Sequence, residues 1–325
     1  STDSDVVGNH GHNDLWMIKL DSAGNFIWKR CYGGTKDDAG RQVYENLDGN
    51  YMGVSYLYSK NGDVSANYGD YDAWIFEVDK DSGNIIWEKN YGGTLEDRVR
   101  SIYQWPDSNY VFVGNTFSTD SDLAGTTNQG GEDLWAAKID KHGNIIWSVQ
   151  YGSPGMDRAY YLVPDKDGNV LVCGRDSTGG IVSNNHGDAD VWILKLDYAT
   201  GNLIWEKSFG GSNEDTGFRI DPSDDNGYLV SATLKSSDGD SPGFKGAADY
   251  WLIKLDSARN IEWSKNYGGP QFDHLYDAFA MPDSTYWMVG FTNSDSLPGS
   301  DVTGVHGEFD LWVVKAGWCD STGTI

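Results

Sequence analysis

The stretch that decides the fold is residues 72–93, Asp72-Ala-Trp-Ile-Phe-Glu-Val-Asp-Lys-Asp-Ser-Gly-Asn-Ile-Ile-Trp-Glu-Lys-Asn-Tyr-Gly-Gly93. Both ends of this stretch recur along the chain. Its aromatic-glycine end starts at Tyr32, Tyr91, Tyr151, Phe209 and Tyr267, with steps of 59, 60, 58 and 58 residues. Its Asp-x-Trp beginning occurs at Asp14, Asp72, Asp133, Asp190, Asp249 and Asp310. A fixed period of this length indicates a repeat architecture.

Each period predicts four short antiparallel strands. Residues 15–20 alternate apolar and polar side chains, and a Gly-Asn turn leads into a returning strand at residues 26–32. An aspartate six residues after the aromatic precedes a third strand, such as 98–104, and a second turn precedes a fourth, such as 110–116. No segment has a 3.6-residue period long enough for a helix. Four-stranded units repeated at this interval predict an all-β fold of the β-propeller class.

The number of blades follows from the inner strands, expected at 39–46, 98–105, 158–164, 216–222 and 274–281. We expect five four-stranded blades, in which residues 1–33 complete the last blade beside strands from 273–292. Such a closing blade combines both ends of the chain and removes an open sheet edge. Six blades, or a piece of a longer array, are the alternatives, because the motif has six beginnings and five ends. The expected organisation is one domain over 1–325, with repeat ends near 34, 93, 153, 211 and 269 and a terminal tail at 316–325.

The last complete repeat carries a family resemblance. Its segments are Asp249-Tyr-Trp-Leu-Ile-Lys-Leu-Asp256 and Asn260-Ile-Glu-Trp-Ser-Lys-Asn-Tyr-Gly-Gly269, with Gly114-Asn-Thr116 and Gly290-Phe-Thr292 from the other half of the pattern. These segments resemble the bacterial β-propeller repeat family, the SBBP-type repeats, over about residues 1–316. The resemblance implies a large secreted or surface repeat protein of a Gram-negative, Bacteroidota-like bacterium.

Composition narrows the partners and the location. The formal net charge of −25 argues against nucleic acid and anionic membranes, because both need a basic face. No apolar run approaches the ~18 residues of a membrane span, so no direct membrane insertion is expected. We expect a secreted or cell-surface location, extracellular or associated with the outer membrane, and a protein or glycan partner there. A disulfide between Cys31 and Cys319 would fasten the two ends, with two free thiols as the alternative.

Binding residues are expected where the repeats differ. Apolar residues of the inner strands are expected to pack within the blades (Val43, Ile102, Leu162, Ile220 and Ala278). The residues before them are polar, differ in every repeat and are expected to face a central channel: Gln42, Ser101, Tyr161, Arg219 and Asp277. Arg98, Arg158 and His274 are expected nearby at its rim. Such a mixed set suits a small polar ligand, for example a sugar; a water-filled channel without a ligand is the alternative.

The repeated tryptophans and aspartates are interpreted mainly as architecture. Eleven of the 14 tryptophans occupy two repeat positions, where they are expected to pack between sheets. The repeated aspartates are expected to accept hydrogen bonds from backbone N–H groups. Ca²⁺ is the alternative and the one cofactor considered, with the densest acidic clusters at Asp120, Asp122, Asp238 and Asp240. Their spacing lacks the full pattern of a calcium loop.

Three functions remain open at this point. The first is a non-catalytic binding or scaffold module within a larger surface protein or assembly. The alternative is a carbohydrate-binding, lectin-like propeller, and the second alternative is a glycoside hydrolase-like enzyme. A hydrolase needs two carboxylates across the substrate, and Asp277 is the one such residue expected in the channel. The sequence also lacks Gly-x-Ser-x-Gly, phosphate-loop and His-Glu-x-x-His motifs, so we expect no enzyme activity.

Overall fold

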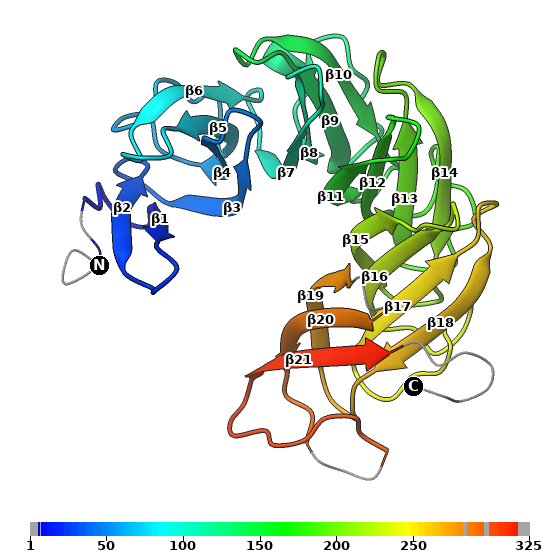
Figure 1. Ribbon diagram of the computed structural model, residues 1–325. Coiled ribbons are helices and arrows are strands. Elements are labelled where there is room, and N and C mark those ends of the chain that lie inside the picture. The colour runs from blue at the N-terminus through cyan, green and yellow to red at the C-terminus, as the bar shows by residue number, and fades with distance from the viewer. Residues whose placement is uncertain (1–5, 7, 282–284, 296–298, 318–325) are drawn as a thin grey trace. The chain divides into compact units, whose positions relative to one another are not determined.

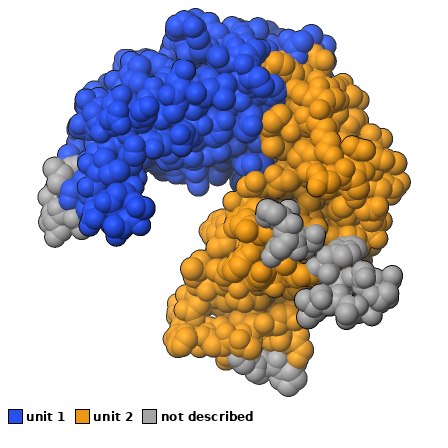
Figure 2. All heavy atoms as spheres, in the orientation of Figure 1, with its two compact units in different colours: residues 1–152, 156–162, 199–202 blue, residues 153–155, 163–198, 203–325 orange. Residues whose placement is uncertain are grey.

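The computed structural model describes residues 6, 8–281, 285–295 and 299–317. These residues form 21 β-strands and one 3-10 helix, η1 (Ser121–Leu123), as Figure 1 shows. Within these residues, no helix has the length and apolar composition needed to cross a membrane. The chain divides into two compact units (Figure 2). Unit 1 comprises residues 1–152, 156–162 and 199–202, and unit 2 comprises 153–155, 163–198 and 203–325.

The strands form six antiparallel sheets, each assembled largely from neighbours in sequence. In unit 1 these are β1 (Leu15–Leu20) with β2 (Phe26–Tyr32); β3 (Asp38–Glu45), β4 (Tyr51–Leu57), β5 (Asp72–Val78) and β6 (Ile85–Tyr91); and β7 (Asp97–Gln104), β8 (Tyr110–Thr116), β9 (Asp133–Ile139) and β10 (Ile145–Tyr151). In unit 2 they are β15 (Thr216–Pro222), β16 (Tyr228–Leu234), β17 (Asp249–Leu255) and β18 (Ile261–Tyr267); and β19 (Asp273–Ala280), β20 (Thr285–Thr292) and β21 (Asp310–Gly317). The remaining sheet runs in the order β11 (Arg158–Pro164), β12 (Val170–Arg175), β13 (Val191–Leu196) and β14 (Leu203–Phe209).

The five-bladed arrangement expected from the sequence is wrong. The six sheets hold two, four, four, four, four and three strands, and none of them closes on itself. The N-terminal strands β1 and β2 form a sheet of their own, while β21 takes the position beside β20. That position is filled along the whole strand, from the pair Thr285 and Gly317 to the pair Thr292 and Asp310. The expected closing blade of residues 1–33 with 273–292 therefore does not form.

The core lies between neighbouring sheets and is rich in aromatic rings. The first tryptophan of the repeat is fully buried in four copies, Trp74, Trp135, Trp192 and Trp251, whereas Trp16 on β1 is 41% exposed. The repeat tyrosine links one sheet to the next, because its hydroxyl donates to the carbonyl of a hairpin glycine about 50 residues later. Within unit 1 these bonds are Tyr32 to Gly83 at 2.5 Å, Tyr91 to Gly143 at 2.8 Å and Tyr151 to Gly201 at 2.8 Å. The expected packing role of the repeated tryptophans is confirmed for the four buried copies.

A one-residue bulge recurs in the inner strands. The register shifts between Gly40 and Gln42 in β3, Val99 and Ser101 in β7, Gly217 and Arg219 in β15, and Leu275 and Asp277 in β19. The extra residue at these four positions is Arg41, Arg100, Phe218 and Tyr276. A bulge re-aims side chains, because it breaks the strict alternation of faces along a strand. It therefore decides which inner-strand residues are presented outside the core.

Candidate functional site

The bulges change the roles expected for the inner-strand residues of unit 1. Ser101 is 2% exposed, and its Oγ has no hydrogen-bond partner among the described residues. The side chain of Gln42 accepts a 2.7 Å hydrogen bond from the backbone N–H of Ile102, so it links β3 to β7. Ile102 is buried as expected, but Val43 is 54% exposed, so the expected packing role of Val43 is wrong. The bulge alone does not account for this difference, because β7 has a bulge at the same place and Ile102 is buried.

Two of the expected rim arginines lie in ion pairs in unit 1. Arg98 pairs with Glu96 and lies over the rings of Tyr56 and Tyr71, with its guanidinium carbon 4.9 and 5.5 Å from their centroids. Arg158 pairs with Glu132, which is 1% exposed and also accepts a hydrogen bond from Asn115. Tyr161, next to these strands, is half-buried. The residues of unit 1 that were expected to bind a ligand are thus polar, and two of them are arginines.

An aromatic cluster in unit 2 carries two exposed rings. It consists of Phe218 on β15, Phe272, His274 and Tyr276 at β19, Phe291 on β20, and Phe309 before β21. His274 lies 5.1 Å from Phe218, 4.9 Å from Tyr276 and 5.2 Å from Phe291 between ring centroids, and Phe291 lies 5.3 Å from Phe309. Tyr276 is 60% exposed and Phe309 is 57% exposed. The cluster therefore offers two open aromatic faces on a packed base of other rings.

His274 at the centre of this cluster is neutral at pH 7. Burial, together with the positive charge of Lys235, lowers its pKa to about 4. Its Nδ1 lies 3.3 Å from the hydroxyl of Thr233, which also accepts a hydrogen bond from the backbone N–H of Leu275. The imidazole therefore acts here as an aromatic ring with one polar edge, and it adds no charge to the cluster.

Two carboxylates lie beside the aromatic cluster and share one arginine. Arg219 donates from Nε and Nη2 to Asp221 at 2.7 and 3.2 Å, and from Nη1 to Asp277 at 3.3 Å. Partial burial raises the pKa of Asp277, although Arg219 opposes that effect. The structure thus brings together Arg219, Asp277 and His274 from the sequence-based set. Sequence reasoning missed Asp221, whose position two residues after Arg219 on the same strand was the available signal.

A polar hollow adjoins Phe309. Its volume is about 630 Å³. It is lined by Gln271, Asn293, Asp295, Val305, His306, Gly307, Glu308 and Phe309. Amide and carboxylate groups thus surround an aromatic edge, which gives hydrogen-bond acceptors and donors next to an apolar surface.

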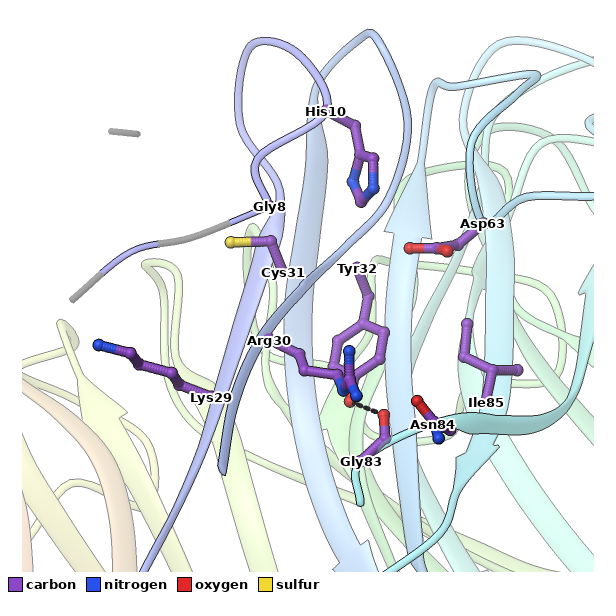
Figure 3. A pocket seen from close by; sticks show the side chains of 10 residues that line it. All are labelled: Gly8, His10, Lys29, Arg30, Cys31, Tyr32, Asp63, Gly83, Asn84 and Ile85. Carbon is purple, nitrogen blue, oxygen red and sulfur yellow. Dashed lines mark hydrogen bonds between the residues drawn. The ribbon is translucent and has the colours of Figure 1, made fainter. Parts of the chain in front are cut away.

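A different hollow, in unit 1, is architectural. Figure 3 shows it between β2 and the β5–β6 turn, where Tyr32 reaches across to Gly83. An equivalent hollow occurs one repeat later, with Tyr91, Asp122, Gly143 and Ile145 in place of Tyr32, Asp63, Gly83 and Ile85. A hollow that recurs at the same repeat positions reflects the spacing between sheets, so we assign it no ligand.

The acidic loop residues considered for Ca²⁺ already hold the backbone of the preceding turn. The carboxylates of Asp120, Asp122, Asp238 and Asp240 accept hydrogen bonds from the N–H groups of Thr94, Gly92, Ser212 and Gly210, at 2.8 to 3.3 Å. Within the part of the chain that the structure describes, no group of three His, Cys, Asp or Glu residues is placed to hold a metal ion. Ca²⁺ binding stays a prediction from the sequence.

The two sets of repeated aspartates meet as buried pairs. Asp72 accepts a hydrogen bond at Oδ2 from the N–H of Tyr68, while its buried Oδ1 has no hydrogen-bond partner. A Cβ added at Gly92 would lie 2.9 Å from this Oδ1 and 2.7 Å from Oδ2 of Asp97, so both oxygens face the same point. The same unpartnered Oδ1 occurs at Asp14, Asp133, Asp190 and Asp249. The expected backbone hydrogen bonds are present, and each accounts for only one oxygen of these carboxylates.

The expected disulfide partly lies outside the described residues. Cys31 is buried on β2, with 7% of its surface exposed, and it lines the hollow of Figure 3. Cys319 is not among the described residues. The Cys31–Cys319 disulfide therefore stays a prediction.

Comparison with known proteins supports a class of fold for this chain and does not show its family. No protein-family model matches it. The regulatory protein FlaEY of Caulobacter vibrioides is 21% identical over 331 residues, which cover 90% of this chain. The chain spans about a third of that protein, 34% of its length.

Solved structures support a β-propeller-like fold. The crystal structure of a protein of unknown function from Bacteroides caccae aligns with a TM-score of 0.51 at 13% identity, over 98% of this chain and 94% of that chain. A levansucrase from B. megaterium aligns with a TM-score of 0.40 at 12% identity, over 92% of this chain and 88% of that chain. The resemblance to bacterial propeller repeats is thus supported for the fold, while membership of that family and a Bacteroidota origin are not shown.

The prediction that the chain is not an enzyme does not stand. The solved structures to which it is similar include enzymes, namely the levansucrase, a xylosidase and a mannose phosphorylase. At these identities the likeness concerns the fold alone, so any site must be argued from this chain's own residues.

Proposed function

We propose that this protein binds carbohydrate through the aromatic cluster of unit 2. The observation that carries the proposal is the exposure of two rings of this cluster, Tyr276 at 60% and Phe309 at 57%, of which Phe309 also lines a polar hollow. A sugar ring has C–H groups on its faces and hydroxyl groups around its edge. Exposed aromatic faces cover the C–H groups, and nearby polar side chains fix the orientation of the hydroxyl groups.

The polar groups around these rings match that requirement. Asp277 and Arg219 lie on the inner strands next to Tyr276, and Glu308, Asn293 and Gln271 line the hollow at Phe309. Carboxylates and amides accept hydrogen bonds from hydroxyl groups, while the guanidinium donates to them. His274 is neutral at pH 7, so the base of the cluster is apolar. A location at the cell surface, where such a ligand would be met, belongs to this proposal.

The test is binding to an array of neutral oligosaccharides, followed by titration of the best ligand. Tyr276→Ala and Phe309→Ala should each weaken binding by about twofold to tenfold, because one aromatic contact contributes roughly 0.5–1.5 kcal/mol. Tyr68→Ala is the matched control, since Tyr68 is 48% exposed and lies in unit 1. Folded protein that binds no glycan, or equal losses in Tyr276→Ala and Tyr68→Ala, would contradict the proposal.

A second function, hydrolysis of a bound glycan, is favoured by the two carboxylates on Arg219. Glycoside hydrolysis uses one protonated and one ionised carboxyl group on either side of the scissile bond. Asp277 has a raised pKa, which suits a proton donor, and Asp221 is its neighbour across Arg219.

Release of reducing ends from the bound oligosaccharide tests this second function. Asp277→Asn and Asp221→Asn should each abolish release while binding persists, and exposed Asp224→Asn should leave it unchanged. Release that persists in both site variants would exclude these carboxylates from catalysis.

A further inference from the structure

Four arginines gather on the inner strands of unit 1. They are Arg41 on β3, Arg98 and Arg100 on β7, and Arg158 on β11, and we call them the arginine cluster. They are half of the eight arginines in a chain whose formal net charge is −25. Arg41 and Arg100 occupy the strand bulges, which present their side chains away from the core. These strands thus carry a local excess of positive charge in a protein that is acidic overall.

Tyrosine rings hold three of these guanidinium groups in place. Arg41 donates a 2.8 Å hydrogen bond to the hydroxyl of Tyr56, and its guanidinium carbon lies 4.7 Å from the centre of that ring. Arg98 lies over the rings of Tyr56 and Tyr71. The guanidinium carbon of Arg100 lies 5.3 Å from the ring centre of Tyr160. Stacking on rings orients a guanidinium and leaves its N–H edge available for a ligand.

The carboxylates of the protein neutralise only part of this charge. Arg98 pairs with Glu96 and Arg158 with Glu132, whereas Arg41 and Arg100 form no ion pair with any described residue. Nε of Arg98 is buried and has no hydrogen-bond partner within the described ranges. Burial and the charges of Arg41, Arg98 and Arg158 lower the pKa of Arg100 to about 10. Like charges held this close, with an unmade hydrogen bond, are stabilised by an anion that binds between them.

We propose that the arginine cluster is an anion site, and that it takes the carboxylate of an acidic sugar. Guanidinium groups bind planar oxyanions through two parallel N–H bonds, which a carboxylate matches in shape. The net charge of −25 repels a long polyanion, so the site suits a short acidic oligosaccharide rather than a long acidic polymer. The sugar in this inference rests on the proposed carbohydrate-binding function, while the oxyanion contact rests on the geometry of unit 1.

Calorimetric titration with trigalacturonate, and with its methyl ester as the neutral counterpart, tests this inference. We expect trigalacturonate to bind at least tenfold more tightly than the ester, and inorganic sulfate to compete with it. Arg41→Gln and Arg100→Gln should each weaken binding of the acid at least tenfold, since each removes a charge-assisted hydrogen bond. Arg100→Lys keeps the positive charge but loses the two parallel N–H donors of the guanidinium group. Its loss of affinity should lie between those of the unaltered protein and Arg100→Gln.

Arg259→Gln is the matched control, because Arg259 also lies over a ring, 5.0 Å from the centre of Trp205 in unit 2. It should bind trigalacturonate as the unaltered protein does, and so should Tyr276→Ala. Equal affinity for acid and ester, or equal losses in Arg100→Gln and Arg259→Gln, would overturn the anion site and leave the proposed function standing. Loss of trigalacturonate binding in Tyr276→Ala would place the acidic sugar at the aromatic cluster and would also overturn it.

Discussion

The buried aspartate pairs are the feature of single residues with the clearest energetic consequence. In the pair of Asp72 and Asp97, burial raises both pKa values, to about 7 and about 6, and the charge of Asp97 raises that of Asp72 further. Burial likewise raises the pKa of Asp133 and of Asp249 to about 6. A proton on the unpartnered Oδ1 of Asp72 would remove a buried negative charge beside Asp97, whose Oδ2 already accepts hydrogen bonds from Gly93 and Ser118. The folded protein thus binds protons that the unfolded chain releases at lower pH.

This pairing predicts that stability falls as the pH rises. The pKa of an unfolded aspartate is about 3.9, so the stabilising contribution of these pairs is complete below that pH. It is lost as the pH rises through the folded values of about 6 to 7. Thermal unfolding from pH 5 to pH 8 should therefore show a falling Tm. A Tm that rises or stays constant over this range would contradict the account.

Asp72→Asn isolates one pair, because the amide keeps the shape of the protonated acid and cannot ionise. Its Tm should exceed that of the unaltered protein at pH 8 and approach it at pH 5, since one pKa unit corresponds to about 1.4 kcal/mol. Asp81→Asn, at an exposed turn position, is the control and should leave the pH dependence unchanged. A lower Tm for Asp72→Asn at pH 8 would show that the pair does not hold a proton.

At the scale of elements, the hairpin between the outer strands shows how local sequence sets structure. Gly24, Gly83, Gly143 and Gly201 have φ values of 83°, 67°, 78° and 76°, as the predicted Gly-Asn turns require. Three of these glycines also touch aromatic residues of another strand, so they serve the packing between sheets as well as the turn. Gly24 has no neighbour within 4 Å of an added Cβ.

This difference predicts unequal effects of the same substitution. Gly24→Ala should destabilise by about 1–2 kcal/mol, the cost of a left-handed conformation for a residue with a Cβ. Gly143→Ala should cost roughly 1–3 kcal/mol more, because its Cβ would lie 2.7 Å from the hydroxyl of Tyr91 and 3.3 Å from Trp87. Urea unfolding of both variants measures this. Equal losses would show that the contact with Tyr91 does not matter.

For the inner strands, the sequence predicted the positions of the strands but not their bulges. The strand positions and their apolar residues Ile102, Leu162 and Ile220 followed from alternation, and these residues are buried. The bulges did not follow, because an extra residue such as Arg100 or Tyr276 has no distinctive local pattern. Two of the four arginines in the cluster, Arg41 and Arg100, and the exposed ring of Tyr276 were therefore missed. Their neighbours Arg98, Asp277 and His274 were found because they differ between repeats.

At the scale of the whole molecule, the period predicted the class of fold but not the count of sheets. The motif begins equally well at Asp14 and Asp310, so periodicity could not decide which copy pairs beside β20. The structure assigns that place to β21, which follows β20 after residues 293–309, and leaves β1 and β2 as a separate sheet. Chain connectivity favours the nearer strand, because closing a shorter loop costs less entropy.

The most direct test of the central claim is the crystal structure of the protein with the oligosaccharide that binds best on the array. The account predicts a sugar ring against the faces of Tyr276 and Phe309, with its hydroxyl groups hydrogen-bonded to side chains such as Asp277, Arg219 or Glu308. A sugar bound instead in the hollow beside Tyr32, with the rings of Tyr276 and Phe309 uncovered, would contradict it.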